Sequence, residues 1–582
     1  MTELLILVVA GAVVVALVTV IAPRFKVAGP LVLLAVGLGV SLLPFVPAFS
    51  LDPEIILVGV LPPLLYSAAV QLPAIEFRRD FVPIAGLSVL LVLFSSVALG
   101  LFFSAVIPGL GLALGIALGA ILSPTDAVAT SIAKRLGIPP RVVTLLEGES
   151  LLNDATALVL LRTAVAAVAS GFSFGAGVAN FAWGVMLALV IGATVGWINL
   201  RVRERVGNSA ANTALSFTVP FIAYLPTEHF GGSGLVAAVV AGIVTGQGAA
   251  RRFTPEQRLS DRLNWRTVEL LLEGGVFLAF GLELEDIVPD NLAEHGGLWH
   301  GTWLALSALG IALVIRGLYV SALIWVQGRR GRHFARERTR IDEAQARLEQ
   351  FEEHVRNAPA RRWGHSEGSA RGARRVDWMR HRISRTLADL DYYRDSPLDG
   401  RHGTIIVWAG MRGVVTLAAA QTLPTEGVED RTLLIFVAFL VALFSLLLQG
   451  LTLPAVVRMV GLTGGGGDEP TRAEQRALDA ELRNASVTAL QTGSLRRRDG
   501  STFPDELVER AGARITQPPD EDVSVRVRDL LELRLAAIDA MRERLTRVGR
   551  DGRYSTAALR HALAELDADQ LSLELRLDTD DE

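Results

Sequence analysis

The chain has 582 residues, a net charge of −4 and 51% hydrophobic residues, with a mean hydropathy of +0.40. This composition is too apolar for a globular enzyme whose surface faces water, so we expect no catalysis, no cofactor and no nucleic-acid partner. The absence of cysteine excludes disulfides and thiolate metal sites. Neither of the two lysines, Lys26 and Lys134, follows a glycine, so the chain has no phosphate-binding loop of the kind that an ATP-driven pump requires.

Thirteen stretches are long and apolar enough to cross a lipid bilayer as helices, which requires about 20 residues. They lie near residues 3–22, 28–47, 54–72, 81–107, 111–133, 143–169, 176–200, 208–226, 233–247, 262–283, 301–326, 403–424 and 431–460. We therefore predict an all-helical, multi-pass membrane protein whose first stretch is retained rather than cleaved as a signal peptide.

Basic residues alternate between successive loops. They occur at Arg24 and Lys26, at Arg78 and Arg79, at Lys134, Arg135 and Arg141, at Arg201, Arg203 and Arg205, and at Arg251 and Arg252, whereas the intervening loops have none. Because cytoplasmic loops are enriched in lysine and arginine, this alternation predicts an odd number of spans, with the N-terminus outside and the C-terminus in the cytoplasm.

The fifth stretch contains an aspartate beside a proline near its midpoint. An ionisable side chain inside a bilayer costs roughly 2.5 kcal/mol or more, so each one indicates a functional site. Pro124 lacks an amide hydrogen and clashes with the preceding turn, so it should interrupt the helix and free backbone groups beside Thr125 and Asp126. Such a break is tolerated where it lines a cavity or an ion site; the alternative is a simple proline kink.

The sixth stretch contains the segment GESLLND at 148–154. On a helix, Ser150 and Asp154 lie one turn apart on one face, and Glu149 and Asn153 form an adjacent pair. Hard alkali cations prefer oxygen ligands, so four oxygen-bearing side chains on one surface indicate a cation site. Polar contacts between helices would explain Ser150 and Asn153, but not two carboxylates.

Positive charges that could neutralise these carboxylates occur later in the chain. Arg316 lies within the eleventh stretch and Arg412 within the twelfth, where Gly410 and Gly413 flank it and predict a second broken helix. Paired interruptions in corresponding halves indicate an inverted-repeat transporter with its site at the middle of the membrane. For Arg316, the alternative is a side chain that reaches to the membrane surface.

Two polar segments follow from the charge distribution. Residues 328–402 are crowded with charge, and the amphipathic stretches 338–357 and 378–394 predict a cytoplasmic helical hairpin or, alternatively, a solvated linker. After a run of glycines we expect a regulatory cytoplasmic tail, so the chain divides into a transmembrane domain over 1–460, which includes the insert, and a tail over 461–582.

These motifs resemble those of the monovalent cation:proton antiporter superfamily, in the bacterial form of its sodium/proton exchanger branch. The matching segments are LPPLL at 61–65, SPTDAV at 123–128, GESLLND at 148–154, SG at 233–234 and GMRG at 410–413. The resemblance covers about residues 1–460. It implies exchange of sodium, or else potassium or lithium, for protons, by a homodimer whose protomers each have a dimerisation domain and a mobile core domain with two crossed, unwound helices.

The resemblance also implies the residues of the ion site. Asp154 would bind the cation or the proton, with Ser150 and the backbone of Thr125 as further ligands of the monovalent cation. Asp126 would act at the helix crossing. Asn153 stands where the electrogenic branch has an aspartate, which implies electroneutral exchange.

Two charged residues would have structural roles by the same resemblance. Glu149 would pair with an arginine on a later span, for which we prefer Arg316. Arg412 would stabilise the helix crossing, where the C-terminal ends of half-helices present negative dipole ends.

A buried carboxylate can hold a proton or a cation but not both, so alternating exposure of Asp154 would exchange one ion for the other. One departure concerns Ser67, because many relatives have a glutamate there, and the cation preference cannot be copied from those relatives. Two other functions remain as alternatives. One is a passive channel, and the other is an intramembrane aspartyl protease built on Asp126 and Asp154, although the residues before them differ from the signatures of such proteases.

Overall fold

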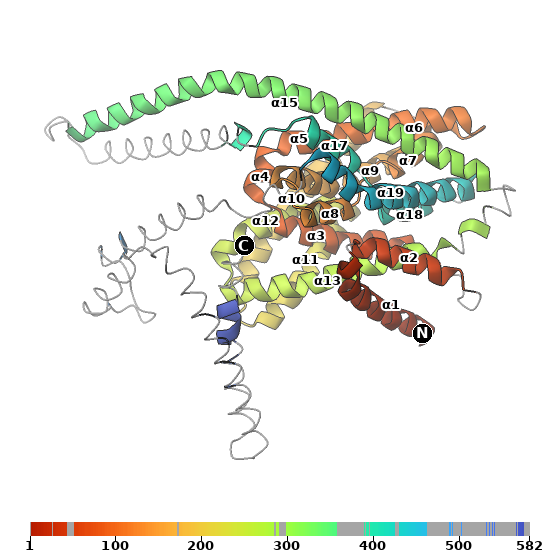
Figure 1. Ribbon diagram of the computed structural model, residues 1–582, viewed down its shortest axis with the longest axis horizontal. Coiled ribbons are helices and arrows are strands. Elements are labelled where there is room, and N and C mark those ends of the chain that lie inside the picture. The colour runs from red at the N-terminus through yellow and green to blue at the C-terminus, as the bar shows by residue number, and fades with distance from the viewer. Residues whose placement is uncertain are drawn as a thin grey trace, which may run out of the picture. The chain divides into compact units, whose positions relative to one another are not determined.

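The computed structural model describes residues 2–25, 27–43, 52–170, 174–284, 287–289, 291, 298–357, 389, 392–394, 396–424 and 430–462, with scattered residues of the tail between 488 and 574 (Figure 1). Within these ranges the regular secondary structure is helical, and no strand occurs. The chain separates into two compact units, Met1–Gly467 and Asp468–Glu582. A helix satisfies its backbone hydrogen bonds internally, as a lipid environment requires.

The helices follow the predicted apolar stretches. In chain order they are α1 (Thr2–Ile21), η1 (Ala22–Phe25), α2 (Gly29–Ser41), η2 (Ile55–Val60), α3 (Leu61–Gln71), α4 (Ala74–Arg79), α5 (Phe81–Ala85), η3 (Gly86–Leu91), α6 (Val92–Val106), α7 (Gly111–Ile121), α8 (Val128–Arg135), α9 (Pro140–Ser170), α10 (Phe174–Arg203), α11 (Ser209–His229), α12 (Gly234–Arg252), α13 (Pro255–Leu282), α15 (Leu298–Asn357), α17 (Gly400–Trp408), α18 (Val414–Gln421) and α19 (Arg431–Val460). Each of the thirteen stretches coincides largely with one helix or with successive helical segments.

Length and hydropathy suffice for a membrane span in five of the described helical segments. These are Phe81–Val106, Pro140–Val168, Ala179–Arg203, Leu298–Arg329 and Arg431–Val460. Shorter apolar helices occur at Val8–Arg24, Gly29–Ser41, Ile55–Gln71, Gly111–Ile121 and Gly234–Ala249. The all-helical fold is confirmed, whereas the number of thirteen spans stays a prediction.

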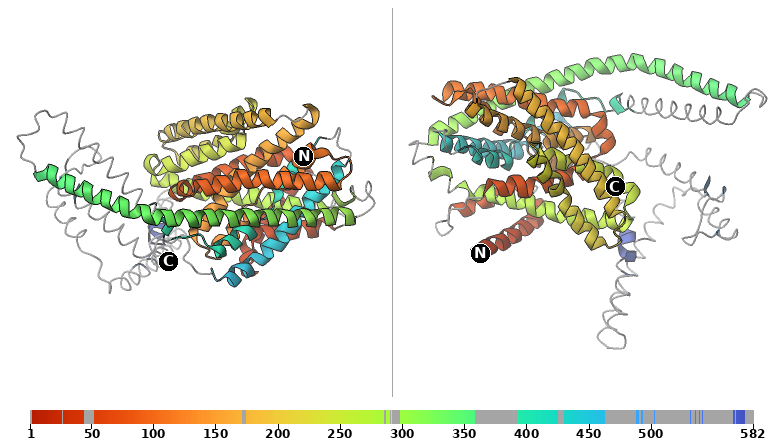
Figure 2. Two further views of the ribbon diagram at one scale, coloured as in Figure 1. Left: turned by 90° about the horizontal axis from the view of Figure 1, so that it is seen from above. Right: turned by 180° about the vertical axis from the view of Figure 1, so that it is seen from behind.

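Two groups of helices make up the first unit (Figures 1 and 2). In the first group, α12 packs against α3, α10 and α11, and α13 packs against α1 and α2. In the second group, α7 packs against α6 and α9, and α19 packs against α15 and α18. Glycines allow the closest approaches: Gly192 lies against the backbone of Ala237, and Gly242 lies against the backbone of Tyr66.

Both predicted breaks are present. The helix of the fifth stretch ends with α7 at Ile121 and resumes with α8 at Val128, and that of the twelfth ends with α17 at Trp408 and resumes with α18 at Val414. The two non-helical segments meet, because the backbone N–H of Asp126 donates a hydrogen bond of 2.7 Å to the carbonyl of Met411. The second group of helices is therefore built around two crossed, broken helices.

The eleventh stretch continues as one helix, α15, through residue 328 and on to Asn357. The first arm of the predicted hairpin, 338–357, is thus helical but has no break that separates it from the preceding span. Most of the second arm, 378–394, lies outside the described residues. Within the second unit, Leu531, Ile538 and Leu573 form a small apolar cluster, and the regulatory role of the tail stays a prediction.

Buried polar contacts hold the segment before α17 against the start of α9. The carboxylate of Asp80, which is fully buried, accepts hydrogen bonds from the guanidinium of Arg141 and, at 2.8 Å, from the hydroxyl of Tyr392. Arg141 also donates to the carbonyl of Ser396. The far end of the insert is thereby fixed to the group of helices that contains both broken helices.

Candidate ion-binding site

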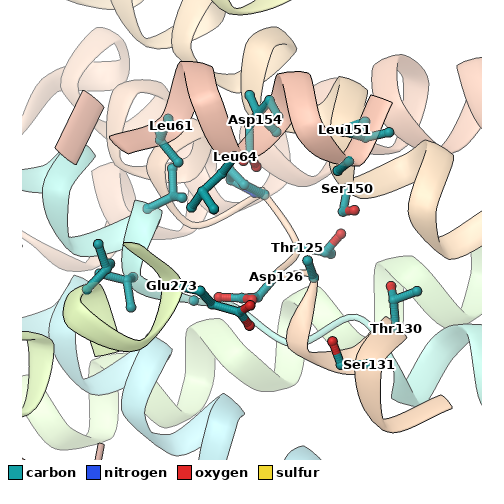
Figure 3. Close-up of a pocket in the computed structure, with 18 of the residues that line it drawn as sticks. Leu61, Leu64, Thr125, Asp126, Thr130, Ser131, Ser150, Leu151, Asp154 and Glu273 are labelled. Atoms are coloured by element: carbon teal, nitrogen blue, oxygen red, sulfur yellow. The ribbon is translucent and has the colours of Figure 1, made fainter. Parts of the chain in front are cut away.

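A cavity of about 280 Å³ lies where the two helix groups meet. On one side, α3, the preceding η2 and α13 line it; on the other, the breaks at 124–127 and 413, α8, the middle of α9 and the start of α18 line it. Figure 3 shows the side chains that project into this space. The cavity therefore contains residues of both predicted polar clusters.

Asp154 lies in this cavity wall, on α9, with 7% of its surface exposed. Among the described residues, its carboxylate takes part in no hydrogen bond or ion pair. Ser150, one turn earlier on α9, also lines the cavity, and its hydroxyl donates a hydrogen bond of 3.1 Å to the carbonyl of Glu147. The Ser150 oxygen keeps a lone pair for a second partner, and the Asp154 carboxylate keeps all of its acceptor sites.

A hydrogen-bonded network fixes the other polar residues of α9. The side-chain amide of Asn153 donates to the hydroxyl of Thr125 at 2.6 Å, and that hydroxyl donates to Glu149 Oε1 at 3.4 Å. Arg316 donates to both carboxylate oxygens of Glu149, at 2.8 Å to Oε2, and to the carbonyl of Ile406 at 2.9 Å. The arginine that pairs with Glu149 is thus Arg316, which lies within the protein rather than at its surface.

Arg412 joins the C-terminal ends of two half-helices. Its Nε donates a hydrogen bond of 3.0 Å to the carbonyl of Leu122, which caps the end of α7. One Nη donates to the carbonyl of Gly410, just beyond the end of α17. Since the last carbonyls of a helix have no intrahelical partner and form the negative end of its dipole, a buried guanidinium is well placed between them.

Asp126 lies at the N-terminal ends of the other two half-helices, α8 and α18. Its Oδ1 accepts a hydrogen bond of 2.9 Å from the backbone N–H of Val128 at the start of α8, and its carboxylate also accepts from the backbone of Val414 at the start of α18. A carboxylate is favourable at the positive end of a helix dipole. These contacts place the Asp126 carboxylate at the crossing of the broken helices, whereas the Asp154 carboxylate has no hydrogen bond or ion pair among the described residues.

Gly413 is needed because the Asp126 carboxylate lies against its Cα. A Cβ built at this position would collide with the side chain of Asp126. We expect Gly413→Ala to lower the free energy of unfolding by about 1–3 kcal/mol, the usual effect of an overpacked site, and to reduce transport. Thermal unfolding in detergent measures the first effect. Gly310→Ala is the matched control, because no atom lies within 4 Å of a Cβ there, and an equal loss of stability in both variants would contradict the prediction.

Two cavity carboxylates of α13 escaped the sequence analysis, as did Glu147 of α9. Glu269 and Glu273, one turn apart on α13, both line the space. In Figure 3, Glu273 lies beside Asp126, with which it interacts electrostatically. The signal that could have found them was present, because both lie within the tenth apolar stretch, where an ionisable side chain indicates function.

No group of three or more histidine, aspartate or glutamate side chains close enough to hold one metal ion occurs among the described residues. Five carboxylates line the cavity, and they are distributed along the space rather than gathered at one point: Asp126, Glu147, Asp154, Glu269 and Glu273. Such a distribution suits a path for a weakly held monovalent cation better than a tightly chelated divalent ion.

Comparison with known proteins identifies the family. A family model described as "Sodium/hydrogen exchanger, transmembrane" matches residues 10–339 and 383–459, which include both broken helices and the whole cavity. The chain belongs to the sodium/hydrogen exchanger family. The exchanger is therefore a multi-pass membrane protein that carries out cation/proton antiport. Its family consists of transporters rather than enzymes. The residues between the two matched segments, 340–382, lie within the charged insert.

Individual relatives and one solved structure agree with this assignment. An uncharacterized Na⁺/H⁺ exchanger of Mycobacterium bovis is 28% identical over 575 residues, which cover 95% of this chain and 93% of that protein. The low-affinity Na⁺/H⁺ antiporter NhaS1 of Synechocystis is 26% identical over 489 residues, covering 83% of this chain and 78% of that protein. In fold, the exchanger is similar to the sodium proton antiporter MjNhaP1 of Methanocaldococcus jannaschii, with a TM-score of 0.55 at 16% identity over 79% of this chain and all of that one.

Proposed function

We propose that the exchanger moves sodium across the membrane in one direction and protons in the other, and that Asp154 binds the two ions in turn. One observation supports this role above the others. Asp154 is a buried carboxylate without a hydrogen bond or ion pair among the described residues, and it faces a cavity between two groups of helices. Leaving a charge buried in this way is costly unless a proton or a cation neutralises it.

Alternating access follows from where the cavity lies. Asp154 and the two broken helices belong to one helix group, whereas α3 and α13 form the facing wall. A rigid movement of the second group, which contains Asp154, against the first would carry Asp154 from one side of the membrane to the other, as in other inverted-repeat transporters. Ser150 and the backbone of Thr125 would complete the coordination of the cation.

Exchange of one cation for one proton follows from the neutral side chain next to Asp154. Asn153 has no charge to exchange, and its amide donates to Thr125. The carboxylates of Asp126 and Glu149 are held by half-helix ends and by Arg316, respectively. Since Glu147 is paired with Lys134, Asp154 would be the single exchangeable charge on α9, and each transport cycle would move no net charge.

Sodium is proposed as the cation because the names of the Mycobacterium bovis exchanger and of NhaS1 describe Na⁺/H⁺ exchange. We further propose that the N-terminus lies outside and the C-terminus in the cytoplasm, as the basic loops indicate. The protein would act as a homodimer, through the helix group that contains α1 and α10. Light scattering of the detergent-solubilised protein would measure the number of subunits.

The proposed exchange is tested with the purified protein in liposomes that contain a pH-sensitive dye. We expect sodium, added outside an acid-loaded vesicle, to raise the internal pH, lithium to do the same, and potassium to do so more weakly. A potassium ionophore that clamps the membrane potential should leave the sodium-driven rate unchanged. Absence of any cation-dependent change overturns the proposed exchange, and a rate that the ionophore alters strongly overturns its electroneutrality.

A further inference from the structure

Besides Asp154, the cavity contains the carboxylate of Glu269, whose surroundings resemble those of an ion-binding side chain. It lies on α13, one helical turn before Glu273, and both side chains line the space that leads to Asp154. The helix opposite, α3, has no acidic residue between Leu61 and Gln71. The negative charge on this part of the facing wall therefore comes from α13.

Two side chains of α3 hold the Glu269 carboxylate in a fixed orientation. The hydroxyl of Ser67, which is buried, donates a hydrogen bond to Glu269 Oε1, and the amide of Gln71 donates to the same oxygen at 2.8 Å. The second oxygen, Oε2, has no hydrogen bond with any described residue. One oxygen is thus used to position the group, and the other is available to a ligand.

Positive charges near Glu269 do not neutralise it through contact. Lys134 and Arg266 interact with it electrostatically, yet neither forms an ion pair with it in the described part of the chain. Lys134 is instead paired with Glu147, at 2.5 Å. The Glu269 carboxylate therefore differs from Glu149, whose charge is matched directly by Arg316.

Unpartnered oxygen atoms elsewhere in the cavity independently indicate a ligand. The hydroxyls of Thr130 and Thr416, whose residues are 5% and 1% exposed, are buried and have no hydrogen-bond partner in the described part of the chain, and both residues line the cavity. Asp154, also buried, has no partner among the described residues. Buried polar groups are normally satisfied, so unsatisfied oxygens around one cavity point to water or a cation that the cavity receives.

We propose that Glu269 is a cation-binding carboxylate on the path to Asp154, that Ser67 and Gln71 position it, and that it sets the apparent affinity for the transported cation. The proposal rests on the proposed exchange and extends it. A cation that enters the cavity binds first to Oε2 of Glu269 and then passes Glu273 to reach Asp154. A fixed carboxylate on the facing wall raises the local cation concentration and so lowers the external concentration required for half-maximal exchange.

The test separates the charge of Glu269 from its hydrogen bonds. Glu269→Gln keeps an oxygen that accepts from Ser67 and Gln71 but removes the charge, whereas Glu269→Ala removes both. We expect Glu269→Gln to raise the KM for sodium about tenfold, equivalent to about 1.4 kcal/mol, with the maximal rate within about twofold of wild type. The matched control is Glu204→Gln, which removes an exposed carboxylate outside the cavity and should leave the KM unchanged.

A swap of the two side chains tests the position of the charge. Glu269→Ser should show the raised KM, and the double variant Ser67→Glu/Glu269→Ser, which moves the carboxylate to α3, should return the KM to within about threefold of wild type, a recovery of more than half of that 1.4 kcal/mol. Thermal unfolding in detergent confirms that each variant is folded. Recovery in the swap supports the proposal.

Two results would overturn it while the proposed exchange stands. One is a wild-type KM in Glu269→Gln combined with reduced stability in Glu269→Ala, which would make Glu269 a structural tie between α3 and α13. The other is a folded swap variant with the same KM as Glu269→Ser. If wild-type protein itself shows no sodium-dependent proton movement, the proposed exchange has failed instead, so the two failures are distinguishable.

Discussion

Replacing Asp154 with asparagine is expected to abolish sodium-driven proton movement and to leave the protein folded. Asparagine has nearly the same shape, but it cannot take up a proton in exchange for a cation. Because the Asp154 carboxylate has no hydrogen bond or ion pair within the described residues, the substitution breaks no contact there, and the loss of a buried charge should keep or raise the free energy of unfolding. The dye assay in liposomes measures transport, and thermal unfolding in detergent measures stability.

Two comparisons make this result specific. Glu228→Gln alters a carboxylate that lies outside the cavity and pairs with the exposed Arg162, so it should leave exchange at the wild-type rate. Asp126→Ala should instead lower the melting temperature, because Asp126 accepts hydrogen bonds at the starts of α8 and α18. Normal sodium-dependent exchange by the Asp154→Asn variant would refute the assignment of Asp154 as the shared site.

The broken helices were predictable because their causes are local. Pro124 cannot complete the helical hydrogen-bond pattern, and the glycines around Arg412 are poor helix formers, so both interruptions appear in the sequence and in the structure. The helical spacing of Glu149 and Asn153 likewise places them where they can reach Thr125 together. Features that depend on a few neighbouring residues could therefore be predicted from the sequence alone.

Features that depend on the packing of distant helices could not be predicted from the sequence. Glu269 and Ser67 are separated by about two hundred positions, and nothing local indicates that their side chains meet. The resemblance placed Asp126 at the helix crossing, but nothing local in the sequence indicated its contacts with Val128 and Val414 at the starts of two half-helices. The continuation of α15 beyond residue 328 was missed for another reason: hydropathy marks the end of an apolar stretch, not the end of a helix.

Among the ion pairs of the described residues, we expect the pair between Arg316 and Glu149 to be the one whose loss by a single substitution lowers stability most. Both residues are 1% exposed, so Glu149→Ala leaves an unpaired buried guanidinium and Arg316→Ala leaves an unpaired buried carboxylate. Breaking a buried pair in this way typically costs about 3–5 kcal/mol. Thermal unfolding in detergent should show a large decrease in melting temperature for either variant. The matched control is Glu204→Ala, whose exposed pair with Arg252 should contribute about 1 kcal/mol or less.

The double variant Glu149→Leu/Arg316→Met separates the structural role of the pair from its role in transport. With both charges removed, stability should recover much of the loss, because a buried ion pair can often be replaced by apolar side chains of similar volume. Exchange should not recover, since Glu149 also accepts a hydrogen bond from Thr125, whose hydroxyl accepts from Asn153 beside Asp154. If the double variant transports at the wild-type rate, the network is not needed to hold the site. If it is as unstable as the single variants, the arginine contributes through its contact with Ile406 rather than through its charge.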